Sequence, residues 1–525
     1  INNSYATGSV NGGGVYIGGL VGDSSGAINN AYAAGNVSGN GSYVGGLVGY
    51  NVGSINNAYA TGDVSGADYV GGLVGINENF DLLYQIANNY TGTISNTYAA
   101  GKVSGGPNVG GLVASNALGT ISDSFWDTEK TELSTSAGGT GKSTSQMEQL
   151  STFIGWDLDA QGGTGKVWRI YEGQTAPLLR SFLTPLTLTP DYDGSGNALT
   201  NIGSVSAPAG TDSSKILGTQ TGNSLTLTSP DANGYVATAD VTGLYSTQQG
   251  YDISAARTIA TPGSAAGDIQ LPNGVDWTNG TLNVNGHVTD AGAVNSSNGV
   301  FNQLGGTWTQ VNSNNAAFEV EDFRISGGTF KRFLSGDGTV ASPYQIGDVY
   351  GLQGVGSAGM LSANYTLAHD IDASGTALWN SNGSPTPTYA GFDPLGDITT
   401  RFAGTFDGQA SSIGGLVVNR PATDNVGLFG YTLNATIQNM GVVGGSVSGN
   451  DHVGGLVGFS VGTTINNAYS TGDVSGKSSY VGGLVGHNFF STLSNAYATG
   501  DVNGSGDRVG GLIGANDSTP VSNVY

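Results

Sequence analysis

The sequence predicts an all-β protein that carries a right-handed β-helix (solenoid) block at each end and a small antiparallel β-domain between them. The main observation is a repeated phrase, Ile-Asn-Asn-Ala-Tyr-Ala-Thr-Gly-Asp-Val, followed after a few variable residues by Val-Gly-Gly-Leu-Val-Gly. Its tyrosines are spaced by 27, 27 and 39 residues in the first block and by 28 and 28 in the second. A short fixed period is typical of solenoids, whose units bury an apolar face only by stacking. The tyrosines are Tyr5, Tyr32, Tyr59, Tyr98, Tyr469, Tyr497 and Tyr525.

The spacing of apolar residues predicts strands within each unit. They recur in bursts of two to four between Gly, Asn, Asp and Ser, which is too short for helices and suits strands joined by tight turns. A rung of 27–28 residues then holds about three strands, and neighbouring rungs lie about 4.8 Å apart. The 39-residue step contains an insertion, which we expect to leave the solenoid as a loop.

Composition along the chain divides it into six segments. The six tryptophans all lie outside the regular repeats, as bulky anchors of a cap or a separate small core would. Alternating Leu and Thr indicate the antiparallel domain, and one short helix is expected between residues 143 and 153. The predicted segments are a repeat block (1–125), a Trp-containing cap (126–182), the small β-domain (183–255), irregular solenoid strands (256–330), a lead-in (331–425) and a second repeat block (426–525).

An asparagine stands two residues before each tyrosine of the repeat. In a stack of rungs, such a column is expected to form a buried ladder of amides, each side chain bonding the next rung and a turn. The predicted ladder comprises Asn3, Asn30, Asn57, Asn96, Asn467, Asn495 and Asn523.

Composition also excludes several classes of function. The chain has 525 residues, 91 glycines, no cysteine and a formal net charge of −23. This charge would repel phosphate backbones and anionic membranes, so we expect no nucleic-acid partner and no membrane insertion. Without cysteine there are no disulfides, thiolate metal sites or thiol catalysis, and we expect no cofactor.

The motifs resemble a known repeat family. Val70-Gly-Gly-Leu-Val-Gly75, with its preceding Tyr-Ala-Thr-Gly, looks like the GLUG repeat of large exported bacterial proteins. These include filamentous-haemagglutinin-like exoproteins of the two-partner secretion type and non-catalytic parts of some secreted metallopeptidases. Tyr192-Asp-Gly194 is similar to the YDG domain of haemagglutinin-like proteins. The segment from Ser124 to Gly173 resembles the piece that closes GLUG arrays.

The resemblance implies an exported structural or adhesive protein, extracellular or on the outer surface of a Gram-negative bacterium. Implied partners are surface glycans or proteins of a host or the environment. The matched phase of the two chain ends suggests a window of a longer repetitive polypeptide, in which this segment associates with itself head to tail.

Catalytic candidates are few, and we expect no enzyme. Asp370 and Asp372 would share a strand face with carboxylates roughly 7 Å apart, which suits a glycosidase pair or a weak Ca²⁺ site. The four histidines are isolated and none precedes a glutamate, so a zinc-peptidase motif is missing. The alternatives are a carbohydrate-active β-helix enzyme and the non-catalytic repeat region of a secreted peptidase. The histidines are His287, His369, His452 and His487.

Overall fold

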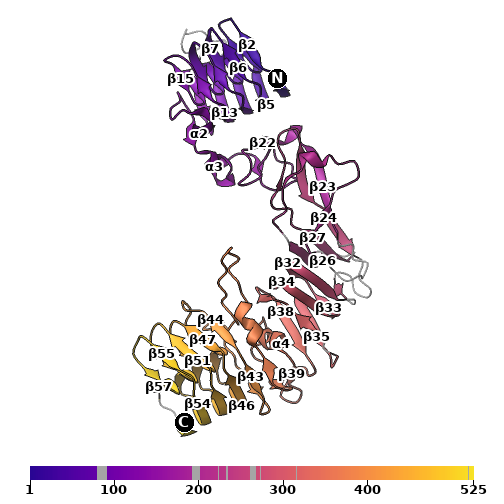
Figure 1. The fold of residues 1–525 in the computed structure, drawn as a ribbon, viewed down its shortest axis with the longest axis vertical. Helices are drawn as coiled ribbons and strands as arrows, with labels where there is room; N and C mark the ends of the chain where they lie inside the picture. Colours follow the sequence, from indigo (N-terminus) through magenta and orange to yellow (C-terminus); the bar gives the residue numbers. More distant parts are fainter. Residues whose placement is uncertain are drawn as a thin grey trace. The chain divides into compact units, whose positions relative to one another are not determined.

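The computed structural model is almost entirely β-structure and divides into two compact units (Figure 1). Unit 1 comprises residues 1–188, 207–221 and 241–255, and unit 2 comprises residues 189–206, 222–240 and 256–525. The all-β class is therefore confirmed. The structure describes residues 1–79, 91–191, 202–222, 224–231, 234–260, 268–271, 274–314, 316–517 and 520–525.

In unit 1, each repeat contributes one strand to each of four parallel sheets. The sequence suggested about three strands per rung, but the Gly-Gly step separates two short strands where one was expected. The first sheet contains β1 (Asn2–Ala6), β5 (Ala27–Ala33), β9 (Ser54–Ala60), β13 (Thr93–Ala99), β17 (Thr120–Ser122), β18 (Phe125–Asp127) and β19 (Thr140–Lys142). The second contains β2 (Val10–Gly12), β6 (Val37–Gly39), β10 (Val64–Ser65) and β14 (Val103–Ser104). The third contains β3 (Ile17–Gly18), β7 (Ser42–Gly45), β11 (Asp68–Gly71) and β15 (Val109–Gly110). The fourth contains β4 (Val21–Ser24), β8 (Val48–Asn51), β12 (Val74–Glu78) and β16 (Val113–Ala117).

Equivalent residues of successive repeats pair in register. Tyr32 is the partner of Tyr5 and of Tyr59, and Tyr59 is the partner of Tyr98 although 39 residues separate them. The additional residues therefore do not shift the strands that follow. Residues 80–90, which hold most of the insertion, lie outside the described residues.

The core of this block consists of aliphatic columns. Ile55, Leu73 and Val74 have no exposed surface, and their equivalents in neighbouring repeats are similarly buried. Glycine is required beside these columns because the backbones approach closely. A Cβ on Gly46 or Gly72 would collide with the glycine carbonyl of the next repeat.

The cap follows the block with short elements. The helix expected between residues 143 and 153 is two short pieces, a capped α-turn and a 3₁₀ turn, rather than one helix. The cap elements are α2 (Thr128–Thr131), α3 (Thr144–Met147), η1 (Leu150–Phe153), β20 (Leu158–Asp159), β21 (Trp168–Arg169), β22 (Leu178–Leu179) and η2 (Arg180–Phe182).

The strands of residues 183–255 pair in a mixed rather than purely antiparallel fashion. Antiparallel pairs join β23 to β24, β25 to β28 and β26 to β27, whereas β23 pairs in parallel with β29. Tyr192-Asp-Gly194 lies outside the described residues. The elements are β23 (Thr184–Pro190), β24 (Val205–Ser206), η3 (Ser213–Lys215), β25 (Leu217–Gly218), β26 (Ser224–Asp231), β27 (Gly234–Ala239), β28 (Leu244–Tyr245) and β29 (Tyr251–Ala255).

Unit 2 begins with two largely parallel sheets around aromatic residues. Trp308, Phe301, Phe323 and Phe330 are fully buried between them. One sheet contains β30 (Arg257–Ala260), β27, β26, β32 (Val275–Asn285), β34 (Val294–Gly305), β36 (Phe318–Glu319) and β37 (Asp322–Ile325). The other contains β31 (Ile269–Leu271), β33 (Val288–Ala291), β35 (Thr307–Val311) and β38 (Thr329–Phe333).

The lead-in joins the second repeat block through one continuous parallel sheet. It contains β39 (Tyr344–Ile346), β40 (Tyr365–Leu367), β41 (Ile371–Asp372), β42 (Thr405–Asp407), β43 (Ser412–Gly414), β46 (Thr436–Val443), β50 (Thr464–Ser470), β54 (Thr492–Ala498) and β58 (Val521–Val524). Two short helical elements, α4 (Val349–Gly354) and η4 (Ser374–Leu378), precede the repeats.

Three further parallel sheets complete the second block, so its repeats use the same four-sheet arrangement as the first. The first of these contains β44 (Val417–Asn419), β47 (Ser446–Gly449), β51 (Asp473–Gly476) and β55 (Val502–Gly504). The second contains β45 (Phe429–Leu433), β49 (Val457–Val461), β53 (Val485–Phe489) and β57 (Ile513–Asp517). The third contains β48 (Val453–Gly454), β52 (Val481–Gly482) and β56 (Val509–Gly510).

Candidate functional site

The predicted asparagine column is not a buried ladder. Its members are half-buried in the middle of the first block and exposed at Asn3, Asn467, Asn495 and Asn523. All seven have a left-handed backbone, with φ between 47° and 54°. Asparagine tolerates this conformation better than most residues, so the column is explained by backbone shape. Its side chains bond only in places, for example Asn523 Nδ2 to Asn495 Oδ1 at 3.1 Å.

A different asparagine column forms the buried ladder. Asn51 and Asn77 have no exposed surface, and their strands pair in register with that of Asn116. Asn51 Nδ2 donates to Asn77 Oδ1 at 2.7 Å, and Asn77 Nδ2 donates to Asn116 Oδ1 at 2.8 Å. In the second block Asn488 Nδ2 donates to Asn516 Oδ1 at 2.7 Å.

The sequence contains a signal for this ladder, which the search for an asparagine beside each tyrosine does not reveal. Each ladder asparagine follows the repeat tyrosine by 18 or 19 residues and is the last or the next-to-last residue of the fourth strand of the unit. Three of these amides also close a turn: Asn51 Nδ2 donates to the carbonyl of Gly53 at 3.1 Å, Asn116 Nδ2 to that of Gly119 at 3.0 Å, and Asn488 Nδ2 to that of Ser491 at 3.1 Å. This column therefore joins successive rungs from inside the block.

In the first block, the tyrosine column is a stack of rings. The ring centroids of Tyr32 and Tyr59 lie 5.0 Å apart, those of Tyr59 and Tyr98 lie 4.8 Å apart, and the rings of both pairs are nearly parallel. Each of the three side chains is 2% exposed. The cap covers them, with the Phe182 ring edge-on to Tyr32 at 5.1 Å and the Trp168 ring 6.2 Å from both Tyr59 and Tyr98.

The hydroxyl groups of the covered tyrosines are also satisfied by the surrounding chain. Burial raises the pKa of all three, so they remain neutral and bond as neutral phenols. The pairs are Tyr98 Oη donating to Pro177 O at 2.9 Å, Tyr59 Oη donating to Gln248 Oε1 at 2.8 Å, and Gln249 Nε2 donating to Tyr32 Oη at 2.8 Å.

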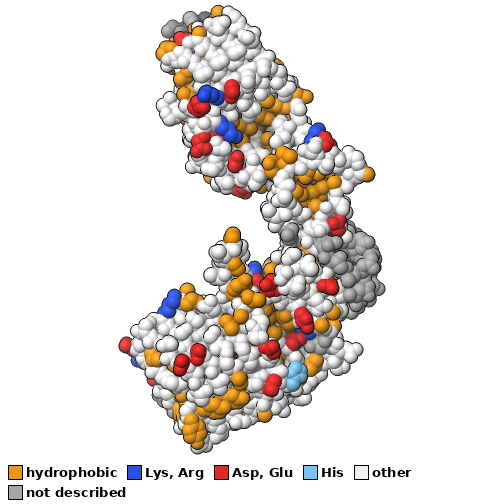
Figure 2. Space-filling model, viewed as in Figure 1, with side chains coloured by type: hydrophobic (Ala, Val, Ile, Leu, Met, Phe, Trp, Pro, Cys, Tyr) orange, Lys and Arg blue, Asp and Glu red, His pale blue; other side chains and the backbone are white. Residues whose placement is uncertain are grey.

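In the second block, the same column is open. The rings of Tyr469 and Tyr497 stack at 4.9 Å with an angle of 4°. Tyr469 is half-buried, Tyr497 is 38% exposed and Tyr525 is 89% exposed. Within the described residues, no hydrogen bond reaches the hydroxyl of Tyr469 or Tyr497. Hydrophobic side chains gather near the end of unit 2 (Figure 2), where Figure 1 places β46 and β54.

Two histidines that appear isolated in the sequence meet in an aromatic cluster of the second block. The His452 ring stacks on Tyr480 at 4.4 Å and lies 5.4 Å from the His487 ring. His487 stacks on Phe459 at 4.8 Å and is 7% exposed. Sequence reasoning missed this contact because the two histidines are 35 residues apart but on adjacent repeats.

The charge of this cluster depends on whether His452 is protonated, and its surroundings shift the pKa of that side chain. Burial lowers the pKa of His452, the neighbouring His487 lowers it further, and Asp451 opposes the shift. His487 Nε2 lies 2.8 Å from Asp517 Oδ2. Of the other two histidines, both exposed, His369 contacts the carbonyl of its own neighbour through Nδ1.

Asp370 and Asp372 are both exposed, and each accepts a hydrogen bond from a backbone N–H group. Asp370 Oδ1 accepts from Ser412 N at 2.7 Å, and Asp372 Oδ1 accepts from Ser374 N at 2.9 Å. The Asp370 bond links two neighbouring strand segments, and the Asp372 bond closes a turn. In the part of the chain that the structure describes, no three His, Asp or Glu side chains converge as metal ligands would.

Comparison with known proteins gives partial matches. The model of the GLUG motif matches residues 40–65 and 477–503. Halomucin of Haloquadratum walsbyi is 36% identical over 135 residues, 25% of this chain and 1% of that protein. A putative Gly-rich membrane protein of Evansella cellulosilytica is 40% identical over 113 residues, 21% of this chain and 12% of that protein.

The chain thus covers only a small part of either relative, and no solved structure matches it. Among the described residues, no helix is long and apolar enough to cross a membrane. The GLUG matches and the two relatives together indicate a repetitive, surface-associated protein.

Proposed function

We propose that this chain is part of an exported adhesive protein, in which stacked repeats form right-handed β-solenoids that display binding surfaces outside the cell. The in-register parallel sheets of both blocks support the solenoid, because each repeat pairs with the one before and the one after it. The GLUG motif and the relatives support surface association. The filamentous-haemagglutinin-like character, the YDG-like domain and the Gram-negative source rest on sequence resemblance.

The observation that carries an adhesive role is the difference between the two tyrosine columns. The same phrase is covered by Trp168 and Phe182 in the first block and left open at Tyr469 and Tyr497 in the second. Aromatic side chains that lie uncovered are common anchors of protein interfaces, since they bury much apolar area with few rotatable bonds. At this position of the repeat, the second block therefore offers an aromatic surface that the cap covers in the first.

The experiment coats beads with the whole chain and measures their retention on an epithelial cell monolayer and on chitin under flow. We expect retention that falls several-fold for the double variant Tyr469→Ser with Tyr497→Ser. The matched control, Tyr16→Ser, alters an exposed tyrosine of the first block and should bind like the native chain. Retention equal to that of albumin-coated beads on both surfaces would refute the adhesive role.

Self-association is the second partner that we propose. The parallel, in-register pairing of successive repeats supports it, because a repeat of another copy can pair with an unpaired strand edge in the same way. Sedimentation of the whole chain should show head-to-tail oligomers that grow with concentration. A monomer at high concentration would contradict this proposal and leave adhesion to other surfaces untouched.

Absence of catalysis stays a prediction. The carboxylates of Asp370 and Asp372 are occupied by Ser412 and Ser374, an arrangement that supports a structural role over a glycosidase pair. Assay of the chain against soluble polysaccharides for released reducing ends tests it, and any turnover would favour the carbohydrate-active alternative.

A further inference from the structure

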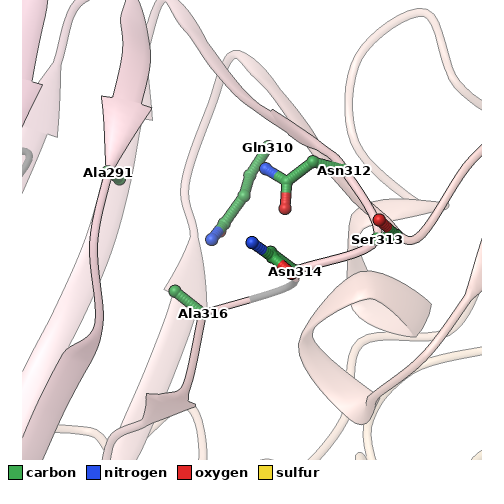
Figure 3. A pocket seen from close by; sticks show the side chains of 6 residues that line it. All are labelled: Ala291, Gln310, Asn312, Ser313, Asn314 and Ala316. Carbon is green, nitrogen blue, oxygen red and sulfur yellow. The ribbon is translucent and has the colours of Figure 1, made fainter.

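A small polar pocket lies in unit 2, beside the loop that follows β35. It has a volume of about 360 Å³ and is lined by Ala291, Gln310, Asn312, Ser313, Asn314 and Ala316. Figure 3 shows the amide groups of Gln310, Asn312 and Asn314 turned toward one another across it. The sequence gives no sign of this site, because its residues belong to no repeat.

The orientation of Gln310 is fixed from beneath the pocket. Its Oε1 accepts from Arg332 Nη1 at 2.6 Å and from Trp308 Nε1 at 3.4 Å. Both partners are donors, so the oxygen faces the core and Nε2 faces the pocket. Gln310 is only 4% exposed. Among the described residues, nothing bonds to its Nε2.

The rim adds three polar residues, Asn312, Ser313 and Asn314, which are exposed to solvent. In the described part of the chain, the side chains of Asn312, Ser313 and Asn314 make no hydrogen bond to protein. A buried polar group normally finds a partner, so the unpaired Nε2 of Gln310 costs stability unless water or a ligand satisfies it, whereas the exposed rim groups are free to bond either. Donors and acceptors thus converge on a site too small for a protein segment.

The pocket is electrically neutral despite the arginine below it. Arg332 is 2% exposed and its guanidinium is occupied by Asp348 Oδ2 at 2.7 Å and the carbonyl of Ala316 at 2.8 Å. No cation is therefore free to hold an anion, and the net charge of −23 disfavours anionic ligands further. A neutral ligand rich in hydrogen-bonding groups fits the site.

We propose that this pocket binds a neutral saccharide. Neighbouring hydroxyl groups of a sugar ring match the paired donor and acceptor of an amide side chain, and Ala291 and Ala316 offer a small apolar surface to its C–H groups. The volume lies at the low end of small-molecule sites, which span about 300–1,000 Å³. This inference rests on the proposed adhesive function and names one ligand class for it.

The test is saturation-transfer NMR of the whole chain with methyl α-mannoside, methyl β-galactoside and N-acetylglucosamine. We expect transfer to at least one sugar, with affinity reduced at least tenfold in Asn312→Ala with Asn314→Ala and in Gln310→Met. The rim variants alter no protein hydrogen bond made by those side chains, so they report on binding even where Gln310→Met unfolds the chain. Asn40→Ala, an exposed asparagine of unit 1, is the matched control.

Absence of transfer to all three sugars would overturn the proposal, as would binding that the rim variants leave unchanged. Either result is distinct from failure of the adhesive function, because the bead assay depends on Tyr469 and Tyr497. Loss of bead retention with intact sugar binding would reject adhesion through the tyrosine column and keep the pocket.

Discussion

Replacing Asn77 by leucine tests whether the inner amide ladder holds the first block together. Asn77 has no exposed surface, accepts from Asn51 at 2.7 Å, and donates to Asn116 at 2.8 Å and to the carbonyl of Gly92 at 3.2 Å. Leucine has a similar size but removes all three bonds. The change thus isolates hydrogen bonding on three adjacent rungs.

The expected loss of stability depends on which partners of Asn77 are left without a hydrogen bond. Gly92 O keeps the bond from Thr120 N at 2.9 Å, and Asn51 Nδ2 keeps its bond to Gly53 O at 3.1 Å. Asn116 Oδ1 loses the donor that the ladder supplies. With net values of about 1 kcal/mol for each bond and more for a stranded buried group, we expect a loss of roughly 3 kcal/mol in the free energy of unfolding.

The assay is urea unfolding with hydrogen exchange of peptides from β9, β12 and β13, which reports on unit 1 alone. The control is Asn40→Leu, since Asn40 is exposed and should change stability by less than about 0.5 kcal/mol. Equal shifts in the two variants would refute the ladder as a stabilising element. A large loss for Asn40→Leu alone would show that exposed leucine dominates.

Three other predictions follow. Burial lowers the pKa of His452 in the folded chain, so the unfolded chain binds the proton more readily. The contribution of His452 to the free energy of unfolding is therefore complete above the unfolded pKa of about 6.5 and is lost as the pH falls through the folded pKa. His452→Phe should flatten the decline in melting temperature between roughly pH 7.5 and 5.5, and an unchanged slope would contradict this. Tyr98→Phe should cost about 1 kcal/mol through loss of the bond to Pro177, whereas Tyr469→Phe should be nearly neutral by urea unfolding; matching costs would show that the cover is unimportant. Gly72→Ala should destabilise by about 1–3 kcal/mol because its Cβ would collide with the next repeat, while Gly13→Ala, which faces open space, should not.

The repeat period predicted the stacking of rungs because identical side chains must share one environment in register. That argument placed Tyr32 over Tyr59 and Leu47 near Leu73 without knowledge of any contact. It did not distinguish the two asparagine columns, since both recur with the same period. The two columns differ in backbone dihedral angle and in burial, and neither can be read from a pattern that Asn satisfies in either role.

The remaining features depend on contacts between segments far apart in sequence. Gln248 and Gln249 reach the tyrosines of the first block across more than 180 residues, and no periodic pattern marks them. His452 and His487 meet for a similar reason, as does the group around Gln310. In each case the position is determined by tertiary packing rather than by local preference.

The in-register pairing of Tyr59 with Tyr98 has a genetic consequence. The strands before and after the longer step keep their partners. The pairing of successive rungs therefore tolerates a change in the number of residues between them. In-frame duplication or expansion at such a joint can therefore change the length of the chain between two rungs without redesigning the core. A gene of this kind can accept insertions at these joints while selection keeps the aliphatic columns the same.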